Sequence, residues 1–84
     1  MEHIDFNQIN SRSKYDREKA LEELTQVSPK YALLAARAGI TDLYSGARRV
    51  SADVIGEYGS KLDRYRLVGA LNDEDWAVRY YLRR

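Results

Sequence analysis

The sequence predicts an all-α protein in which about five helices, joined by very short turns, stack as a short α-solenoid. Three observations support this fold class. Helix-start signals recur along the chain, no segment alternates apolar and polar residues over the length of a strand, and the chain resembles itself when shifted by 31 residues. A chain of 84 residues forms one domain at most, and without cysteine it has no disulfide to supplement a small core.

We expect the helices at residues 13–26, 29–38, 42–58, 61–71 and 73–84. Residues 1–12 are expected to form a flexible N-terminal arm, so that residues 13–84 make up the single domain. The first helix is the least regular of the five. Asp16 and Lys19 stand in it where Ala47 and Val50 stand one period later.

The second helix has a strong start. The Ser28 hydroxyl can accept a backbone N–H that has no other partner, and Pro29 at the first helical position loses only a donor that would stay unpaired. The three later helices begin with a capping side chain followed by an acidic residue in the first turn, which the helix dipole favours. These combinations are Thr41 with Asp42, Ser60 with Asp63, and Asn72 with Asp75.

Two glycines mark expected helix ends. Gly39 and Gly59 stand just before the next starts, where a terminal residue with positive φ suits glycine because it has no Cβ. Within the helices the apolar residues recur at spacings of three and four, so each helix has one face to bury. The expected core comprises Val50, Ile55, Leu67, Leu71 and Val78.

The internal repeat favours a stack of helical hairpins over a closed bundle. A shift of 31 residues places Leu62 on Tyr31 and Leu71 on Ile40. The same shift places Arg48 on Arg17, which adds a degenerate first unit before the other two. A repeat of this length built from paired helices is typical of an α-solenoid, in which each unit buries its apolar face against its neighbours.

Two stretches resemble a known family. Residues 46–59, GARRVSADVIGEYG, resemble the second helix of a HEAT repeat of the short phycobilin-lyase type. Residues 67–79, LVGALNDEDWAVR, resemble the leucine-rich first helix, the acidic turn and the Val-Arg pair that opens the following second helix. The resemblance covers roughly residues 28–84 and is weak over 13–27. It implies HEAT-like helical hairpins and says little about function, because fold does not imply function.

The resemblance also implies a role for the arginines of the repeat. In HEAT units the arginine of the Val-Arg pair reaches the acidic turn of a neighbouring unit, which implies structural ion pairs of Arg48 and Arg79 with Asp42 and Asp73. The alternative is that these arginines bind phosphate or a partner carboxylate through their planar guanidinium groups. On the structural interpretation, Arg79→Ala is expected to lower the melting temperature.

The sequence predicts no enzyme, no cofactor and no metal site. His3 is the sole histidine, and it lies in the expected arm, where a general base or a metal ligand is hard to hold in place. Glu22 and Glu23 are adjacent helical residues that do not face each other, so we interpret them as part of a solvated face rather than as a catalytic pair. There is no glycine-rich phosphate loop and no serine-histidine motif.

Residues suited to binding are better represented in the last helix. Trp76, Tyr80 and Arg83 share one helical face, and the 31-residue shift places Arg49 at the position of Tyr80. Trp, Tyr and Arg dominate binding hot spots, so these four residues are the predicted contact surface for another protein. The predicted function is that of an adaptor, inhibitor or assembly subunit. The alternative for Trp76 is that it packs under the C-terminal end as a cap.

Two other functions remain open. Residues 28–84 carry ten Lys and Arg against seven acids, and arginines interleaved with aromatics suit nucleic-acid binding, although the excess is small. The chain also stops in its last helix without a capping helix, so a second copy of the chain is the other candidate for covering that end. No apolar run is long enough to span a membrane and the acidic N-terminus is unlike a secretory signal, so a cytoplasmic location is expected.

Overall fold

The computed structural model describes residues 13–66 and 68–83, and within this part of the chain every regular element is a helix. The elements are α1 (Lys14–Val27), α2 (Pro29–Gly39), α3 (Ser45–Tyr58), α4 (Lys61–Arg66), the 3-10 helix η2 (Val68–Asn72) and α5 (Trp76–Arg83). The predicted all-α class is confirmed, and the helix expected at 61–71 is divided into α4 and η2. The arm predicted at 1–12 lies outside the described residues.

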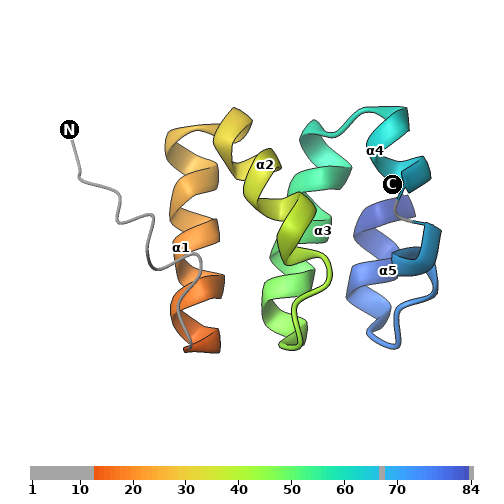
Figure 1. Ribbon diagram of the computed structural model, residues 1–84, viewed down its shortest axis with the longest axis horizontal. Coiled ribbons are helices and arrows are strands. Elements are labelled where there is room, and N and C mark those ends of the chain that lie inside the picture. The colour runs from red at the N-terminus through yellow and green to blue at the C-terminus, as the bar shows by residue number, and fades with distance from the viewer. Residues whose placement is uncertain (1–12, 67, 84) are drawn as a thin grey trace.

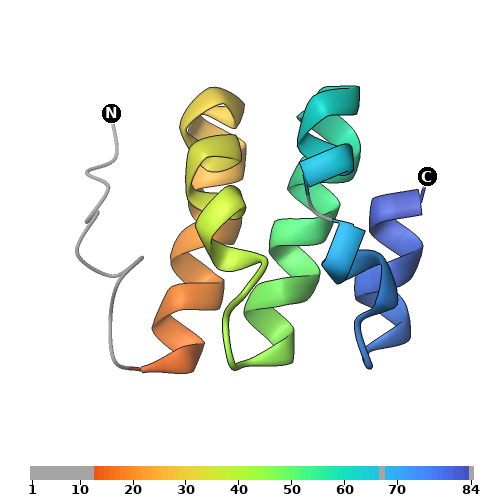
Figure 2. The same cartoon turned by 45° about the vertical axis from the view of Figure 1, so that its right-hand side comes forward.

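The helices lie in two layers. α1, α3 and α5 stand side by side in one row, with α3 packed against both of the others (Figure 1). α2 packs against α1 and α3 on one side of that row, and α4 and η2 follow on the same side against α3 and α5 (Figure 2). In the second layer α2 therefore leads into α3 of the row, and α4 followed by η2 leads into α5.

The core fills the space between the layers. Ile55 and Val78 have no exposed surface, as expected, whereas Val50 and Leu71 are half-buried at its edge. Leu67, the remaining predicted core residue, lies outside the described residues. Small side chains let the helices approach closely, because three alanines at their contacts are completely buried. These are Ala32, Ala36 and Ala52.

Two of the predicted helix starts are confirmed. The Ser28 hydroxyl accepts the Tyr31 N–H at 3.4 Å, and Pro29 occupies the first turn of α2. At α4 the capping is reciprocal, because the Ser60 hydroxyl accepts the Asp63 N–H at 3.3 Å while the Asp63 carboxylate accepts the Ser60 N–H at 2.9 Å. Serine capping supplies acceptors for backbone donors that have no partner inside the helix.

The predicted starts of α3 and α5 are each a few residues too early. Asp42 and Asp75, the acids expected in the first turns, both precede their helices. The carboxylates of Asp42 and Asp73 accept the backbone N–H groups of Tyr44 and Asp75, at 2.9 and 2.8 Å. Each aspartate thus holds a turn ahead of its helix, and α3 begins at Ser45 and α5 at Trp76. The Thr41 hydroxyl donates to the Ala38 carbonyl rather than capping α3.

The interpretation of the glycines is also wrong, because no described glycine has a positive φ. Gly59 has extended backbone, with φ −75°, and Gly39 is the last residue of α2. Gly39 lies where two helices approach: a Cβ there would lie 2.2 Å from Ser51 Oγ of α3. The absence of a side chain at this position leaves room for the Ser51 hydroxyl between α2 and α3.

Candidate functional site

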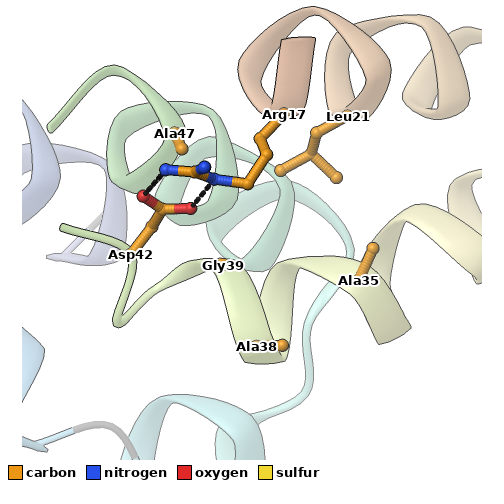
Figure 3. Close-up of a pocket in the computed structure, with 7 residues that line it drawn as sticks. All are labelled: Arg17, Leu21, Ala35, Ala38, Gly39, Asp42 and Ala47. Atoms are coloured by element: carbon orange, nitrogen blue, oxygen red, sulfur yellow. Dashed lines mark hydrogen bonds and ion pairs between the residues drawn. The ribbon is translucent and has the colours of Figure 1, made fainter. Parts of the chain in front are cut away.

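The most regular feature of the structure is an arginine-aspartate pair that recurs with the period of the sequence repeat. The Arg17 guanidinium donates to both carboxylate oxygens of Asp42, at 2.7 and 2.8 Å. One repeat later the Arg48 guanidinium donates to Asp73 at 2.9 and 3.3 Å. Figure 3 shows the first pair, with the Leu21 side chain nearby. Arg17 holds the pKa of the Asp42 carboxyl below its usual value by hydrogen bonding, against the opposing effect of partial burial.

The backbone of the two turns repeats as well. The N–H groups of Asp42 and Asp73 donate to carbonyls three residues earlier, at 3.0 and 3.1 Å. Arg48 and Arg79 each donate a further hydrogen bond to the main-chain carbonyl of the aspartate in their own turn. Arg48 therefore ties two successive turns together, whereas Arg79 reaches the carbonyl of Asp73 and not its carboxylate. The first arginine, Arg17, was not named among the predicted pairs, although the sequence repeat places it under Arg48.

Two further ion pairs link successive helices. Arg37 of α2 donates to Asp63 of α4 at 2.7 and 3.2 Å, and this arginine, together with hydrogen bonds from Ser60, lowers the pKa of Asp63 to about 2. Arg49 of α3 donates to Asp75 at 2.9 and 2.7 Å and lowers the pKa of that carboxyl. Arg49, a predicted contact residue, is therefore already engaged by an acid while its side chain remains half-exposed.

The structure brings three of the four predicted contact residues together. Trp76 and Tyr80 are 69% and 57% exposed, and with Arg79 and Arg83 they surround a hollow of about 350 Å³ on α5. The Arg83 guanidinium donates to the Leu71 carbonyl at 2.8 Å, which fixes it over η2. The exposure of Trp76 does not fit a side chain packed under the C-terminal end as a cap.

Arg49 lies on the opposite side of Trp76, in a larger groove of about 580 Å³ that runs over α1, α3 and α5. We call it the three-helix groove. Its apolar lining is contributed by α3 and α5, with Trp76 at one wall. The apolar residues are Val50, Val54, Trp76, Ala77 and Tyr81.

The charged lining of the three-helix groove is mainly acidic. Glu18 and Glu22 come from α1, and Asp53 and Arg49 from α3. The sequence did not single out Glu18 or Asp53, and it assigned Glu22 to a solvated face. The signal was present, because Glu22 and Asp53 are one repeat apart and so occupy equivalent positions in successive helices of the row.

The described residues offer no sign of a metal centre, since nowhere in 13–66 and 68–83 do three His, Cys, Asp or Glu side chains gather to hold an ion. None of the helices in that part of the chain is long and apolar enough to cross a membrane. His3, which is not expected to act as a general base or metal ligand, lies outside the described residues.

Comparison with known proteins gives no match, whether with protein-family models, with curated proteins or with solved structures.

Proposed function

We propose that the chain is a short HEAT-like solenoid that binds another protein, as an adaptor, inhibitor or assembly subunit, and catalyses no reaction. The order of α1, α3 and α5 in one row supports the solenoid, because a solenoid places equivalent helices next to each other. The arginine-aspartate pairs, which recur one repeat apart together with their backbone hydrogen bonds, support it further.

The observation that carries the binding function is the exposure of Trp76 beside the three-helix groove. A tryptophan side chain that is 69% exposed keeps a large apolar surface in water, although neighbouring Ala77 and Val78 are buried. Tyr80 extends the same exposed surface by one helical turn. Aromatic side chains in such positions are the residues that partner proteins most often cover.

Nucleic-acid binding has less support. Three of the arginines that would form a basic surface, Arg37, Arg48 and Arg49, are each paired with an aspartate. The three-helix groove adds carboxylates beside the exposed tryptophan, and these repel a phosphate backbone. Nucleic-acid binding is therefore the alternative that the test below distinguishes from protein binding.

The test is affinity capture from nuclease-treated native lysate with three forms of the protein. Wild type and Tyr31→Ala are expected to retain the same stoichiometric partner, and Trp76→Ala is expected to lose it. Tyr31 is the matched control because it is an aromatic residue, 54% exposed, on α2 in the other layer. Measured with the purified partner, Trp76→Ala should weaken affinity by about 2 kcal/mol or more while the far-ultraviolet circular dichroism stays helical.

Two outcomes contradict the proposal. A partner retained equally by Trp76→Ala and wild type means that this surface is not the binding site. Recovery of material that disappears on nuclease treatment means that the protein binds nucleic acid instead.

A further inference from the structure

We infer that the three-helix groove takes a cationic helical segment of the partner protein that contains both arginine and aliphatic side chains. This inference rests on the proposed function, and it names the chemistry of the partner at that site. It follows from the charges of the groove, from its apolar floor and from the aromatic rings of Trp76 and Tyr81 in its lining.

The charges of the groove favour a cationic occupant. The lining holds three carboxylates, those of Glu18, Glu22 and Asp53, and one guanidinium, that of Arg49, so its formal charge is −2. The Arg49 guanidinium already donates two hydrogen bonds to Asp75, at 2.9 and 2.7 Å, and Glu18 is hydrogen-bonded to Tyr44. The whole chain carries a formal charge of +1, so the groove differs in sign from the molecule. Complementary charge of this kind guides a partner into place and excludes partners of the wrong sign.

The floor of the groove suits the stems of arginine side chains. Val50 and Val54 lie one turn apart on α3, and Ala77 faces the groove from α5. Arginine keeps a long apolar stem below its charged group, so it can cover such a floor while the guanidinium reaches a carboxylate. The planar guanidinium can also bind a carboxylate through two parallel hydrogen bonds, which a lysine ammonium cannot do.

Trp76 and Tyr81 supply the third element of recognition. Both rings line the groove, and a cation over the face of an aromatic ring is attracted by its quadrupole, most strongly for tryptophan. An exposed indole beside carboxylates therefore favours arginine over an apolar or an acidic side chain. Phosphate groups of a nucleic acid would instead face the same carboxylates and be repelled.

The groove contains its own reporter, because Trp76 is the only tryptophan of the chain. The probe is an 18-residue helical peptide of arginine and leucine without aromatic residues, and the control peptide has glutamate in place of every arginine. We expect the arginine peptide to shift Trp76 fluorescence emission in a saturable way, and the glutamate peptide to leave it unchanged. Added salt should weaken the binding of the arginine peptide, because solvent-exposed charge pairs are screened.

Two charge-reversal variants separate groove binding from general attraction. Glu22→Lys should weaken the binding of the arginine peptide about tenfold, because a like charge is placed against the peptide inside the groove. Glu23→Lys is the matched control, since Glu23 is the next residue of α1, is likewise exposed and does not line the groove. The affinity of Glu23→Lys for the arginine peptide should stay within about twofold of wild type, because an exposed charge outside the groove acts only weakly on the peptide through solvent.

Four results would overturn the inference: equal binding of the two peptides, no shift with either, equal weakening by the two variants, or a shift produced by a single-stranded oligonucleotide. A shift that depends on protein concentration alone would also overturn it and assign the groove to a second copy. If the peptide fails but the captured partner still depends on Trp76, the binding function stands and only the cationic partner is wrong. If capture is independent of Trp76 as well, both proposals fall.

Discussion

The contact between Gly39 and Ser51 can be tested with a double-mutant cycle. Ser51 is completely buried, and its hydroxyl has no hydrogen-bond partner among the described residues. A Cβ at residue 39 would lie 2.2 Å from Ser51 Oγ but 3.4 Å from Ser51 Cβ. Gly39→Ala should therefore clash with the hydroxyl alone and not with the rest of the side chain.

The expected magnitudes follow from these distances. Gly39→Ala gains up to about 1 kcal/mol of helix propensity and loses about 1–3 kcal/mol to overpacking, so we expect a net destabilisation of about 1 kcal/mol. Ser51→Ala removes a buried hydroxyl without a partner and should stabilise the protein by about 1 kcal/mol. The equivalent positions in the repeats before and after are apolar and buried, namely Ala20 and Leu82. In the double variant the clash is gone, so it should be more stable than wild type.

The assay is chemical denaturation followed by circular dichroism for wild type, both single variants and the double variant. The coupling free energy between the two sites should be about 1–3 kcal/mol, since residues in direct contact are not additive. Additive effects within about 0.5 kcal/mol would refute the proposed contact. A loss of stability in Ser51→Ala would refute the view that its hydroxyl has no partner.

Two further predictions concern the ion pairs. The pKa of Asp63 is lowered from 3.8 to about 2, so the stability that its carboxylate contributes is complete above its unfolded pKa and is lost as pH falls from 4 toward 2. Denaturation at several pH values should show a loss of about 1–2 kcal/mol in the free energy of unfolding of wild type, a magnitude that is reduced by solvent screening because Arg37 is half-exposed. In Asp63→Asn the free energy of unfolding should depend less on pH over the same range. Arg48→Ala should destabilise by about 3 kcal/mol, because the Arg48 and Asp73 side chains are both only 11% exposed. Arg49→Ala should lose less than about 1 kcal/mol, because the Arg49 side chain is 51% exposed and the Asp75 carboxylate keeps its hydrogen bond from the Ala77 N–H. Equal losses in the two variants would contradict this ranking.

Local signals in the sequence predicted the helices well where a side chain caps its own helix. Ser28 and Ser60 each accept an N–H from the first turn of the helix they precede, and both starts were confirmed. The starts at Thr41 and Asn72 were wrong, because Asp42 and Asp73 use their carboxylates in a turn that also receives an arginine from the preceding unit. The arginine lies 25 residues earlier in the chain than the aspartate, so a pattern of local capping does not predict the pair.

The candidate site was predictable only in part. The exposed face of Trp76, Tyr80 and Arg83 follows from helical spacing, since these residues recur at three and four along α5. The three-helix groove was not predicted, because its acidic wall belongs to α1 and its aromatic wall to α5, with α3 between them. Arg49, a predicted contact residue, is paired with Asp75. This pairing was likewise not predicted, because the two residues come from different parts of the chain.

The sequence by itself determined the all-helical class and the internal repeat, because capping and apolar spacing are properties of neighbouring residues. Only the tertiary structure decided how the repeated positions are used. Glu22 and Asp53 occupy equivalent positions of successive repeats, and both line the groove. Ala20, Ser51 and Leu82 occupy another set of equivalent positions, and all three are buried in the core. The physical reason is that charge and exposure at a position depend on the helices packed beside it. That packing brings together residues far apart in the chain.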